Sequence, residues 1–354
     1  MGTETRCVGV VGSGTMGAGI AECAVLAGHV VALRSRSEAR ASATRARLEA
    51  SLERRVTKGN LSPGQAAAAL RRVEIATDLE VLAAADIVIE SVEEDLTTKR
   101  ALFAELSRTC ERAELLATNT STLPVVELAM ATGRPESVCG IHFFNPAPVM
   151  RLVELVRPLT ASAETMARAR AFAESLGKSA VEVNDEAGFV VNALLFPYLN
   201  DAIRLKERGV ASLEAIDEAM KGGCGFPMGP FALLDLVGLD VSLSILEALH
   251  AEFRDARYAP APLLRRMVTA GWLGRKTGRG FYTYERRPTP GQGGYASEPG
   301  GQDPGGQDPG GQDPSGQDPS GQDPGGQDPG GQDPGGQDPS GQDAAGREPS
   351  RAGS

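Results

Sequence analysis

The first half of the chain alternates short apolar runs, rich in β-branched residues, with longer segments rich in Ala, Leu, Glu and Arg. Short strands that alternate with helix-length segments are typical of a parallel α/β sheet. The apolar runs predict strands within residues 7–12, 29–35, 86–92, 114–121, 138–144 and 152–156. The pattern therefore predicts an α/β fold with a doubly wound sheet.

The alternation stops near residue 186, and the segments 188–209, 212–220 and 230–253 read as helices with broad apolar faces. A smaller all-helical domain is predicted from there on, so the expected organisation is a sheet domain over 1–185, a helical domain over 186–284 and a tail over 285–354. Such apolar faces on a small domain favour burial against another domain or subunit, and a homodimer is expected.

Two further helices are predicted between the second and third strands. The segment 37–59 is long, charged and rich in alanine, and LSPGQAAAALRRV follows it. Ser62 is a suitable N-cap for the second helix, and Pro63 suits its first helical position. The two segments predict a helical hairpin that projects from the sheet.

The net charge of −10 belongs mostly to residues 285–354, which carry twelve acidic and four basic side chains on repeats of the type GGQDP. That composition predicts a disordered, solvated tail, and a role of the tail in partner binding stays open. The rest of the chain is nearly neutral and has no basic run, so no nucleic-acid partner is expected.

No run of about 20 apolar residues is present, and the chain enters its first strand without a charged and apolar leader, so we expect a cytoplasmic protein with no membrane partner. The five cysteines are scattered and never spaced as CxxC. They predict reduced thiols, with no disulfide framework and no thiolate metal site.

A glycine-rich turn follows the first strand. VGVVGSGTMGAGI places Gly12, Gly14 and Gly17 in the spacing G-x-G-x-x-G, with Thr15 and Met16 inside it. The first glycine permits a tight turn, the second lets a pyrophosphate approach the backbone, and the third lets the helix pack closely on the sheet. Because the helix N-terminus also offers unpaired N–H groups to phosphates, the turn predicts a Rossmann-like fold and a dinucleotide cofactor.

The end of the second strand distinguishes NAD from NADP in such folds, since an acid there binds the ribose 2′-hydroxyl. This chain has Ser35 at that place, with Arg34 and Arg36 on either side. A hydroxyl beside a guanidinium would bind a 2′-phosphate, which a carboxylate would repel. The sequence predicts an NAD(P) cofactor and leans toward NADP(H); the alternative that the arginines are solvated surface charges stays open.

His142 is one of three histidines and begins the stretch HFFNPAPVMRLVELV. Its place at the end of a strand puts it on the carboxyl side of the sheet, where ligands bind in open α/β folds. An imidazole beside a hydride acceptor can take a hydroxyl proton while hydride leaves the same carbon. Glu154, on the next strand, could bind the second ring nitrogen, so the two residues form a candidate dyad for alcohol and carbonyl redox chemistry.

Six stretches follow one another along the chain: GVVGSGTMGAGIAECAVLAGH, TNTSTLP, HFFNPAPVMRLVELV, GFVVNALLFPYLNDAIRL, AMKGGCGFPMGPFALLDLVGLD and GRKTGRGFYTY. Together they closely resemble the short-chain L-3-hydroxyacyl-CoA and 3-hydroxybutyryl-CoA dehydrogenases. The resemblance runs from Cys7 to Tyr284. It implies a Rossmann-like domain joined to a helical dimerisation domain, and an enzyme that oxidises the L-3-hydroxyl of an acyl-CoA, with 3-hydroxybutyryl-CoA as the first candidate.

The resemblance also implies roles for individual residues. His142 is similar in position to the catalytic base of that family and Glu154 to its partner. Ser121 and Asn192 would bind the reacting oxygen or orient the substrate, with Ser121 counted among the substrate contacts as well. The implied cofactor contacts are Glu94, Lys99, Asn145 and Lys276, and the implied coenzyme A contacts are Ser51 and Lys58. Ser35 departs from the family pattern.

Two other functions stay open at this point. One is a dehydrogenase of small free hydroxy acids, similar to the gulonate dehydrogenase and crystallin-related branch, from which only Ser51 and Lys58 would distinguish the chain. The other is a non-catalytic dimeric scaffold, against which the dyad, Ser121 and Asn192 argue.

Overall fold

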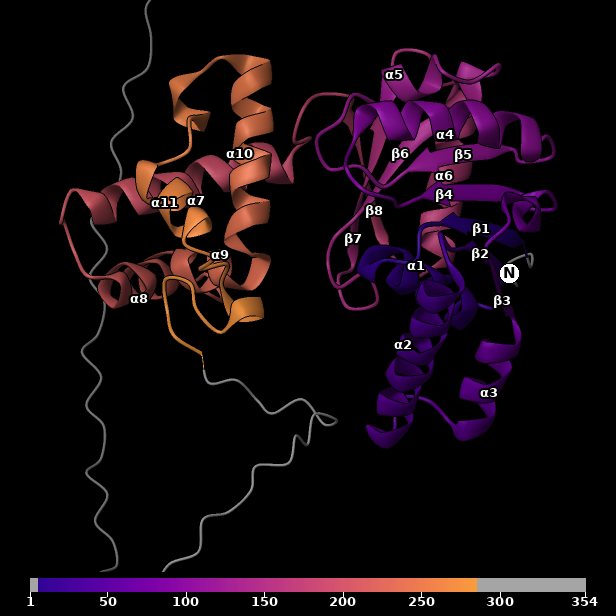
Figure 1. The fold of residues 1–354 in the computed structure, drawn as a ribbon, viewed down its shortest axis with the longest axis horizontal. Helices are drawn as coiled ribbons and strands as arrows, with labels where there is room; N and C mark the ends of the chain where they lie inside the picture. Colours follow the sequence, from indigo (N-terminus) through magenta and orange to yellow (C-terminus); the bar gives the residue numbers. More distant parts are fainter. Residues whose placement is uncertain (1–5, 285–354) are drawn as a thin grey trace, which may run out of the picture. The chain divides into compact units, whose positions relative to one another are not determined.

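The computed structural model describes residues 6–284, so the predicted tail lies outside the described residues. Eight strands form one sheet in the order β3-β2-β1-β4-β5-β6-β7-β8 (Figure 1). The chain begins with an inner strand, β1, and adds later strands on both sides of it. This doubly wound order confirms the predicted Rossmann-like fold class. The strands are β1 (Cys7–Val11), β2 (Val30–Arg34), β3 (Val73–Ala76), β4 (Ile87–Glu90), β5 (Leu115–Thr118), β6 (Val138–Phe143), β7 (Leu152–Arg157) and β8 (Ser179–Asn184).

The direction of the strands changes once. All pairs from β3 to β6 are parallel, whereas β7 runs antiparallel to β6 and β8 follows β7 in parallel. The short loop 144–151 explains this, because a parallel pair needs a crossover of a dozen or more residues. The prediction of a parallel sheet is therefore corrected at β7. The reversal sets His142 directly opposite Glu154.

The strands β3 and β8, at the two edges of the sheet, were not predicted from the apolar runs. VEIA and SAVEVN each contain an acidic residue, and Val181 in β8 is 46% exposed. Edge strands are commonly short and carry charged residues that discourage pairing with other chains. Because of these polar residues, the two segments do not stand out as apolar runs, and the sequence did not predict them as strands.

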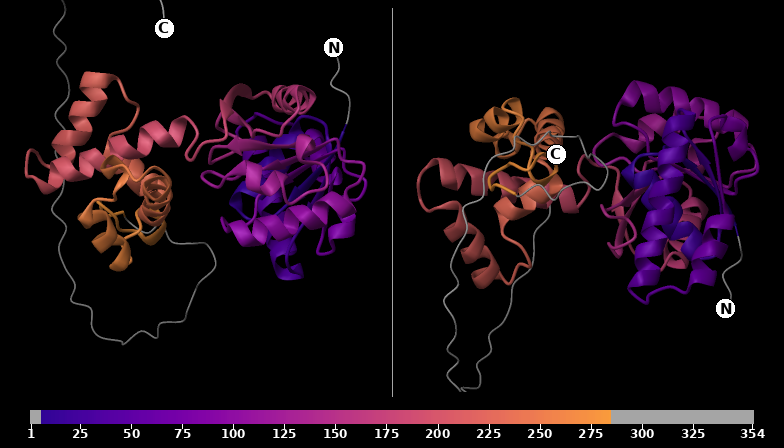
Figure 2. Two further views of the ribbon diagram at one scale, coloured as in Figure 1. Left: turned by 90° about the horizontal axis from the view of Figure 1, so that it is seen from above. Right: turned by 60° about the horizontal axis from the view of Figure 1, so that its bottom comes forward.

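The interior strands divide their side chains between two cores. Along β4, Ile87 and Ile89 point into one core and Val88 into the other. Figure 2 shows helices on both faces of this sheet, as its two apolar faces require. The first core includes α1 (Thr15–Leu26), α2 (Glu38–Thr57) and α6 (Ala163–Ser175), and the second η1 (Leu79–Leu82), α4 (Leu96–Thr109) and α5 (Val125–Ala129).

The helices α2 and α3 (Pro63–Arg71) form the predicted hairpin, drawn in indigo in Figure 1. Ser62 caps α3: its hydroxyl accepts the N–H of Gln65 at 3.2 Å, and the Gln65 side chain accepts the N–H of Ser62 at 2.9 Å. This reciprocal capping box, with Pro63 at the first helical position, confirms the predicted start of the helix.

The chain from residue 191 to 284 is helical and surrounds a third core. The stretch 230–253, predicted as one helix, is two, because Gly238 has a φ of +105° that no helix accommodates. No helix within residues 6–284 is both long and apolar enough to cross a membrane. The elements are α7 (Val191–Glu207), α8 (Leu213–Cys224), α9 (Pro230–Val237), α10 (Leu239–Phe253) and α11 (Pro262–Thr269), with short turns at Pro135–Ser137 (η2), Ala256–Tyr258 (η3) and Arg275–Thr277 (η4).

The buried carboxylate of Asp235 in α9 holds the last described residues in place. It accepts the backbone N–H groups of Phe281 and Tyr282, each at 2.9 Å, and the hydroxyl of Tyr284 at 2.9 Å. A Cβ at Gly280 would lie 1.9 Å from Oδ1 of this carboxylate. Burial raises the pKa of Tyr284 to about 12, and the hydrogen bond to Asp235 adds to the rise.

We expect Asp235→Ala to lower the free energy of unfolding by about 2 kcal/mol or more, because each N–H group left without a partner costs about 1–3 kcal/mol. Glu218→Ala is the control, since Glu218 forms an exposed pair with Lys221 and should cost less than about 1 kcal/mol. Urea unfolding of both variants checks this, and equal midpoints would contradict the role given to Asp235.

Candidate active site

The turn between β1 and α1 has the geometry that its glycines predict. Gly12 has a φ of +117°, and a Cβ there would lie 2.2 Å from the carbonyl oxygen of Ser91. A Cβ at Gly17 would lie 2.0 Å from the carbonyl oxygen of Gly12. Gly17 therefore serves the site by letting α1 begin close against β1.

The N-terminus of α1 faces a pocket at the carboxyl edge of the sheet. Ser13, Gly14, Thr15 and Met16 line this pocket together with Gly12. No side chain caps the start of α1, and its first turn contains no acid. Its first N–H groups and the positive end of its dipole are thus available to an anion, and they fit the pyrophosphate of a dinucleotide.

Ser35 lies behind the glycine turn. Its side chain is fully buried, and its hydroxyl donates to Oγ of Ser13 at 2.8 Å. Thr44 of α2 donates to the carbonyl oxygen of Ser13 at 2.9 Å. Both hydroxyl groups thus support the glycine turn, and the contact of Ser35 with the cofactor stays a prediction.

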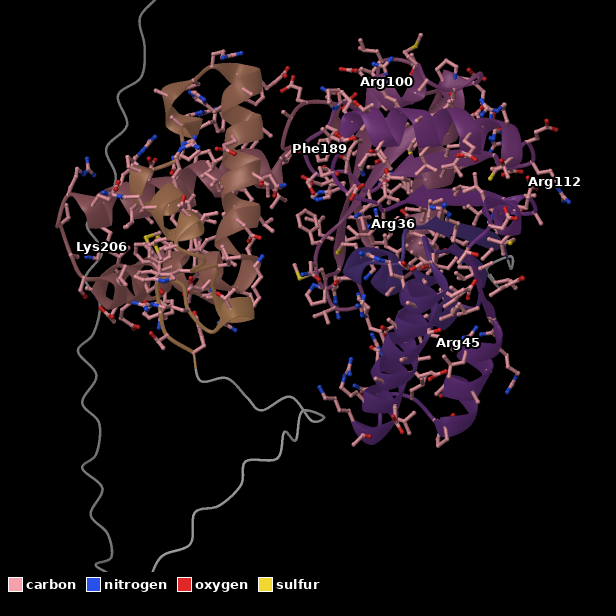
Figure 3. All side chains as sticks on the ribbon, viewed as in Figure 1. Arg36, Arg45, Arg100, Arg112, Phe189 and Lys206 are labelled. Carbon is pink, nitrogen blue, oxygen red and sulfur yellow. The ribbon has the colours of Figure 1, made fainter. Side chains whose placement is uncertain are left out.

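Arginine side chains give this end of the pocket positive charge. Arg34, Arg36 and Arg40 all line it. Arg34 donates to the carbonyl oxygen of Thr77 at 3.2 Å. Arg36, labelled in Figure 3, lies 3.6 Å from Glu93, and both side chains are more than half exposed. Exposed pairs contribute at most about 1 kcal/mol, so Arg36 can exchange this partner for an anionic ligand at little cost.

The predicted hydrogen bond between His142 and Glu154 is present. Nδ1 of His142 lies 2.7 Å from Oε2 of Glu154, and the two residues are 5% and 1% exposed. Because the carboxylate faces Nδ1, we assign the proton to that nitrogen, which leaves the lone pair of Nε2 to accept a proton. The pair has the chemistry of a general base with an orienting acid.

Glu154 keeps its charge although it is buried. Burial alone would raise its pKa, but hydrogen bonds from His142, Val191 and Val190 outweigh burial and lower the pKa of Glu154. The N–H groups of Val190 and Val191 reach Oε1 at 3.0 and 2.9 Å. Glu154 is therefore an ionised carboxylate that can hold the imidazole through Nδ1 and stabilise a positive charge on it.

The loop after β5 connects the strand of His142 with the pocket. Oδ1 of Asn119 accepts the N–H of Phe143 at 2.8 Å, and Asn119 and Ser121 both line the pocket. The N–H of Ser121 donates to Oε1 of Glu94, also a pocket residue, at 2.8 Å. Burial opposes ionisation of Glu94, but the charge of Lys99 and the hydrogen bonds from Thr120 and Ser121 outweigh burial and lower the pKa of Glu94.

Lys99 lies behind the pocket and is not among its described lining residues, so its contact with the cofactor stays a prediction. Its side chain is 1% exposed, and Nζ lies 2.8 and 2.9 Å from the two oxygens of Glu90. Nζ also lies 3.1 Å from Glu94. Thr118 donates to Glu90 at 2.7 Å and completes this buried network. The network fixes Glu94, and through it the loop that carries Ser121.

Five further predicted residues are not among the described residues that line the pocket. Asn192 is buried in the first turn of α7, beside the residues that bind Glu154. Asn145 is exposed in the loop after β6, and Lys276 is paired with Asp240. On the hairpin, Ser51 is half-buried and Lys58 is exposed. Their contacts with cofactor or coenzyme A stay predictions.

Three residues of the site were not predicted from the sequence: Asn119 binds the strand of His142, Thr44 holds the glycine turn, and Arg40 lines the pocket. The polar residues NTS directly after the buried strand β5 were a signal for Asn119, because ligands bind at the carboxyl ends of parallel strands. Within residues 6–284, no group of three or more His, Cys, Asp or Glu side chains is arranged to hold a metal ion.

A sheet whose first strand ends in a glycine turn, with an uncapped helix and a buried histidine–carboxylate pair at the same edge, is the arrangement of a dinucleotide-dependent dehydrogenase. Residues 7–186 match the family model described as 3-hydroxyacyl-CoA dehydrogenase, NAD binding domain, and residues 188–284 match the model of the C-terminal domain. The chain belongs to the 3-hydroxyacyl-CoA dehydrogenase family and is an NAD-binding enzyme of that class.

Individual relatives are similar over the whole described region. A 3-hydroxybutyryl-CoA dehydrogenase of Mycobacterium tuberculosis is 48% identical over 286 residues, which cover 80% of this chain and all of the relative. Another of Clostridioides difficile is 44% identical over 277 residues, covering 78% of this chain and 99% of the relative. The crystal structure of (S)-3-hydroxybutyryl-CoA dehydrogenase from Ralstonia eutropha is 43% identical with a TM-score of 0.76, covering 80% of this chain and all of that one.

The buried network around Lys99 leads to a prediction about stability. Lys99→Met should cost about 3–5 kcal/mol, because it leaves the carboxylate of Glu90 buried without its cation. The neighbouring Arg100→Met is the control: Arg100, labelled in Figure 3, forms an exposed pair with Glu127 at 3.4 Å. Thermal unfolding and NADH binding by fluorescence are measured for both. If Lys99→Met unfolds like the control but binds NADH weakly, Lys99 contacts the cofactor directly and the supporting role is wrong.

Proposed function

We propose that this dehydrogenase interconverts L-3-hydroxybutyryl-CoA and acetoacetyl-CoA, with His142 as the general base. The observation that carries the proposal is the buried hydrogen bond between His142 and Glu154, on a strand that Asn119 ties to the pocket. The choice of a four-carbon acyl group rests on the names of the relatives in M. tuberculosis and C. difficile.

The residues of the dyad divide the chemistry between them. When bound, the nicotinamide dinucleotide supplies the hydride acceptor for the oxidation. Nε2 of His142 accepts the proton of the 3-hydroxyl while hydride leaves the carbon that bears it, and the C–O bond becomes a carbonyl. Glu154 holds the imidazole through Nδ1 and stabilises the imidazolium that forms. In the reverse reaction His142 returns the proton to the carbonyl oxygen.

Ser121 and Asn192 are proposed to bind the reacting oxygen and to orient the substrate. The backbone of Ser121 is fixed by Glu94, so its hydroxyl can be presented from a rigid loop. Asn192 lies one residue after Val191, whose N–H binds Glu154. Side chains fixed in this way are suited to hold a substrate in the geometry that proton and hydride transfer require.

Coenzyme A is proposed to bind along α2. Ser51 and Lys58 are seven positions apart, which places them on one side of a helix, and Lys58 ends α2 as its C-cap. The ammonium group is exposed, and a cation there suits a phosphate of coenzyme A. These two positions distinguish the proposal from an enzyme that acts on free hydroxy acids.

The preference for NADP(H) over NAD(H) stays a proposal, now carried by arginines alone. Arg36 and Arg40 line the pocket next to the glycine turn, and the second strand ends without an acid. Such a site suits a 2′-phosphate better than a site with a carboxylate does. The alternative is that the enzyme uses NAD(H), as the name of the matching family model states.

A homodimer formed by the helical domain is the proposed assembly. Large apolar side chains are exposed on several of its helices; Leu194 of α7 is 72% exposed and Leu236 of α9 is 50% exposed. Soluble monomers rarely leave extended apolar patches open, and a symmetric contact would cover the same residues on both subunits.

We expect His142→Gln to lower kcat for acetoacetyl-CoA reduction about 10²- to 10⁴-fold, because general acid–base catalysis contributes that much. The control is His29→Gln. His29 is also buried, but it does not line the pocket, and its Nε2 lies 2.9 Å from Oγ of Ser175. Steady-state rates are compared with calorimetric NADH binding, which should persist in both variants. Near-full turnover by His142→Gln would end the dyad model.

Free acetoacetate should be a poor substrate of the wild type. Equal rates with acetoacetate and acetoacetyl-CoA would remove coenzyme A from the proposal.

Arg36→Ala should raise the KM for NADPH roughly 10- to 150-fold and leave NADH nearly unchanged, because one hydrogen bond to a charged group contributes about 1.5–3 kcal/mol. Arg47→Ala, at an exposed position of α2 outside the pocket lining, is the control. The ratio of kcat/KM for the two cofactors is the measurement. A wild-type enzyme that prefers NADH would show that these arginines are surface charge.

A further inference from the structure

The segment that joins β8 to α7 contacts both members of the dyad. The N–H groups of Val190 and Val191 donate to Oε1 of Glu154 at 3.0 and 2.9 Å. The ring of Phe189, labelled in Figure 3, packs on the imidazole of His142 with 5.5 Å between ring centroids. Glu154 therefore binds the imidazole with one oxygen and the start of α7 with the other.

The backbone of this segment has an unusual conformation. Gly188 has a φ of +77°, and Phe189 has a φ of +49°. A bulky L-residue adopts the left-handed region only where its surroundings fix it there, and such residues concentrate at functional sites. Here the N–H of Phe189 donates to the carbonyl oxygen of Glu186 at 3.0 Å, and the N–H of Ala193 to that of Gly188 at 3.1 Å. This left-handed turn directs the next two N–H groups at Glu154.

Other charged groups near the dyad are engaged elsewhere. Asp185 binds two backbone N–H groups of α5, and Glu186 is exposed. Glu182 of β8 pairs with Arg157 and Arg170. The first turn of α7 contains no acid, and aromatic rings flank the imidazole. Within the described chain, the charge of Glu154 is thus compensated by the imidazole and the two N–H groups of the turn.

We propose that the left-handed turn at Gly188 and Phe189 is a positioning element for catalysis, which holds two N–H groups on Glu154 and thereby sets how tightly His142 holds its proton. The proposal rests on the proposed function, in which His142 is the base. Hydrogen-bond donors withdraw negative charge from a carboxylate, so the imidazole is a weaker base than it would be beside an unshared carboxylate. If the donors move away, the dyad as a pair binds its proton more tightly.

Gly188→Ala crowds the turn against the backbone of α7 and has a matched control. A Cβ at Gly188 would lie 2.7 Å from Cδ2 of Leu249 and 3.1 Å from the backbone nitrogen of Ala193. Gly209, just beyond the other end of α7, has a φ of +71°, and a Cβ there would meet nothing within 4 Å. Gly209→Ala therefore introduces the same backbone strain without a contact to the dyad.

Two measurements report the proton affinity of the dyad. One is the pH dependence of kcat/KM for oxidation, and the other is the NMR titration of the imidazole nitrogens in the absence of cofactor. The chain has three histidines, so His142→Gln identifies the signals. Gly188→Ala should raise the apparent pKa of the dyad by about one unit in both measurements, and Gly209→Ala should leave it unchanged. Glu154→Gln should lower it, because the negative charge is gone.

A further variant removes a donor directly. Val191→Pro lacks the N–H of Val191, and because proline disfavours a helical backbone in the residue before it, the change also disturbs Val190, which has a ψ of −52°. It tests the same upward shift if Gly188→Ala does not fold. The proposal is overturned if the donor variants titrate like Gly209→Ala or shift downward. Full turnover by His142→Gln overturns the proposed function instead, and the NMR titration still decides whether the turn controls the imidazole.

Discussion

The antiparallel pairing of β7 with β6 determines where the chemistry of this protein lies. Residues directly opposite each other in an antiparallel pair have their Cβ atoms about 5 Å apart on the same face of the sheet. The register His142 to Glu154 therefore turns a separation of twelve residues into a hydrogen bond of 2.7 Å. A parallel β7 would need a crossover helix in place of the loop 144–151, and His142 would then lack the carboxylate opposite it. The remaining contacts of the site, from Asn119 on one side and α7 on the other, are built onto this one pair of strands.

Four buried or half-buried carboxylates connect separate segments of the chain. In each case one side chain accepts two consecutive backbone N–H groups, which offset the cost of removing its charge or dipole from water. Apolar contacts supply most of the driving force for packing but have little directionality, whereas such a pair of hydrogen bonds fixes the position of the partner segment. The four cases are Glu154 with Val190 and Val191, Asp185 with Val125 and Val126, Asp217 with Phe231 and Ala232, and Asp235 with Phe281 and Tyr282.

Local features of the site could be predicted from the sequence, whereas features that depend on distant neighbours could not. The turn at Gly12 and the partner of His142 follow from short-range spacing and strand alternation, which one sequence contains. The hydroxyl of Ser35 turns toward the glycine turn because of residues that only the folded chain brings together. Lys99 is hidden because two carboxylates enclose it, although an isolated lysine on a helix is usually solvated. The helical spacing of apolar residues continues through Gly238, but the positive φ of this glycine separates α9 from α10.

The hydrogen bonds from Val190 and Val191 to Glu154 also concern the order in which the protein is synthesised. The carboxylate belongs to the seventh strand, but two of its donors belong to the first helix of the following domain. A nascent chain that has left the ribosome only as far as β8 can pair its strands. Until Val190 and Val191 follow, Oε1 of Glu154 has to accept hydrogen bonds from water instead of from their N–H groups. An incomplete chain that ends at β8 would therefore hold His142 and Glu154 on their strands without the two hydrogen bonds from the start of α7.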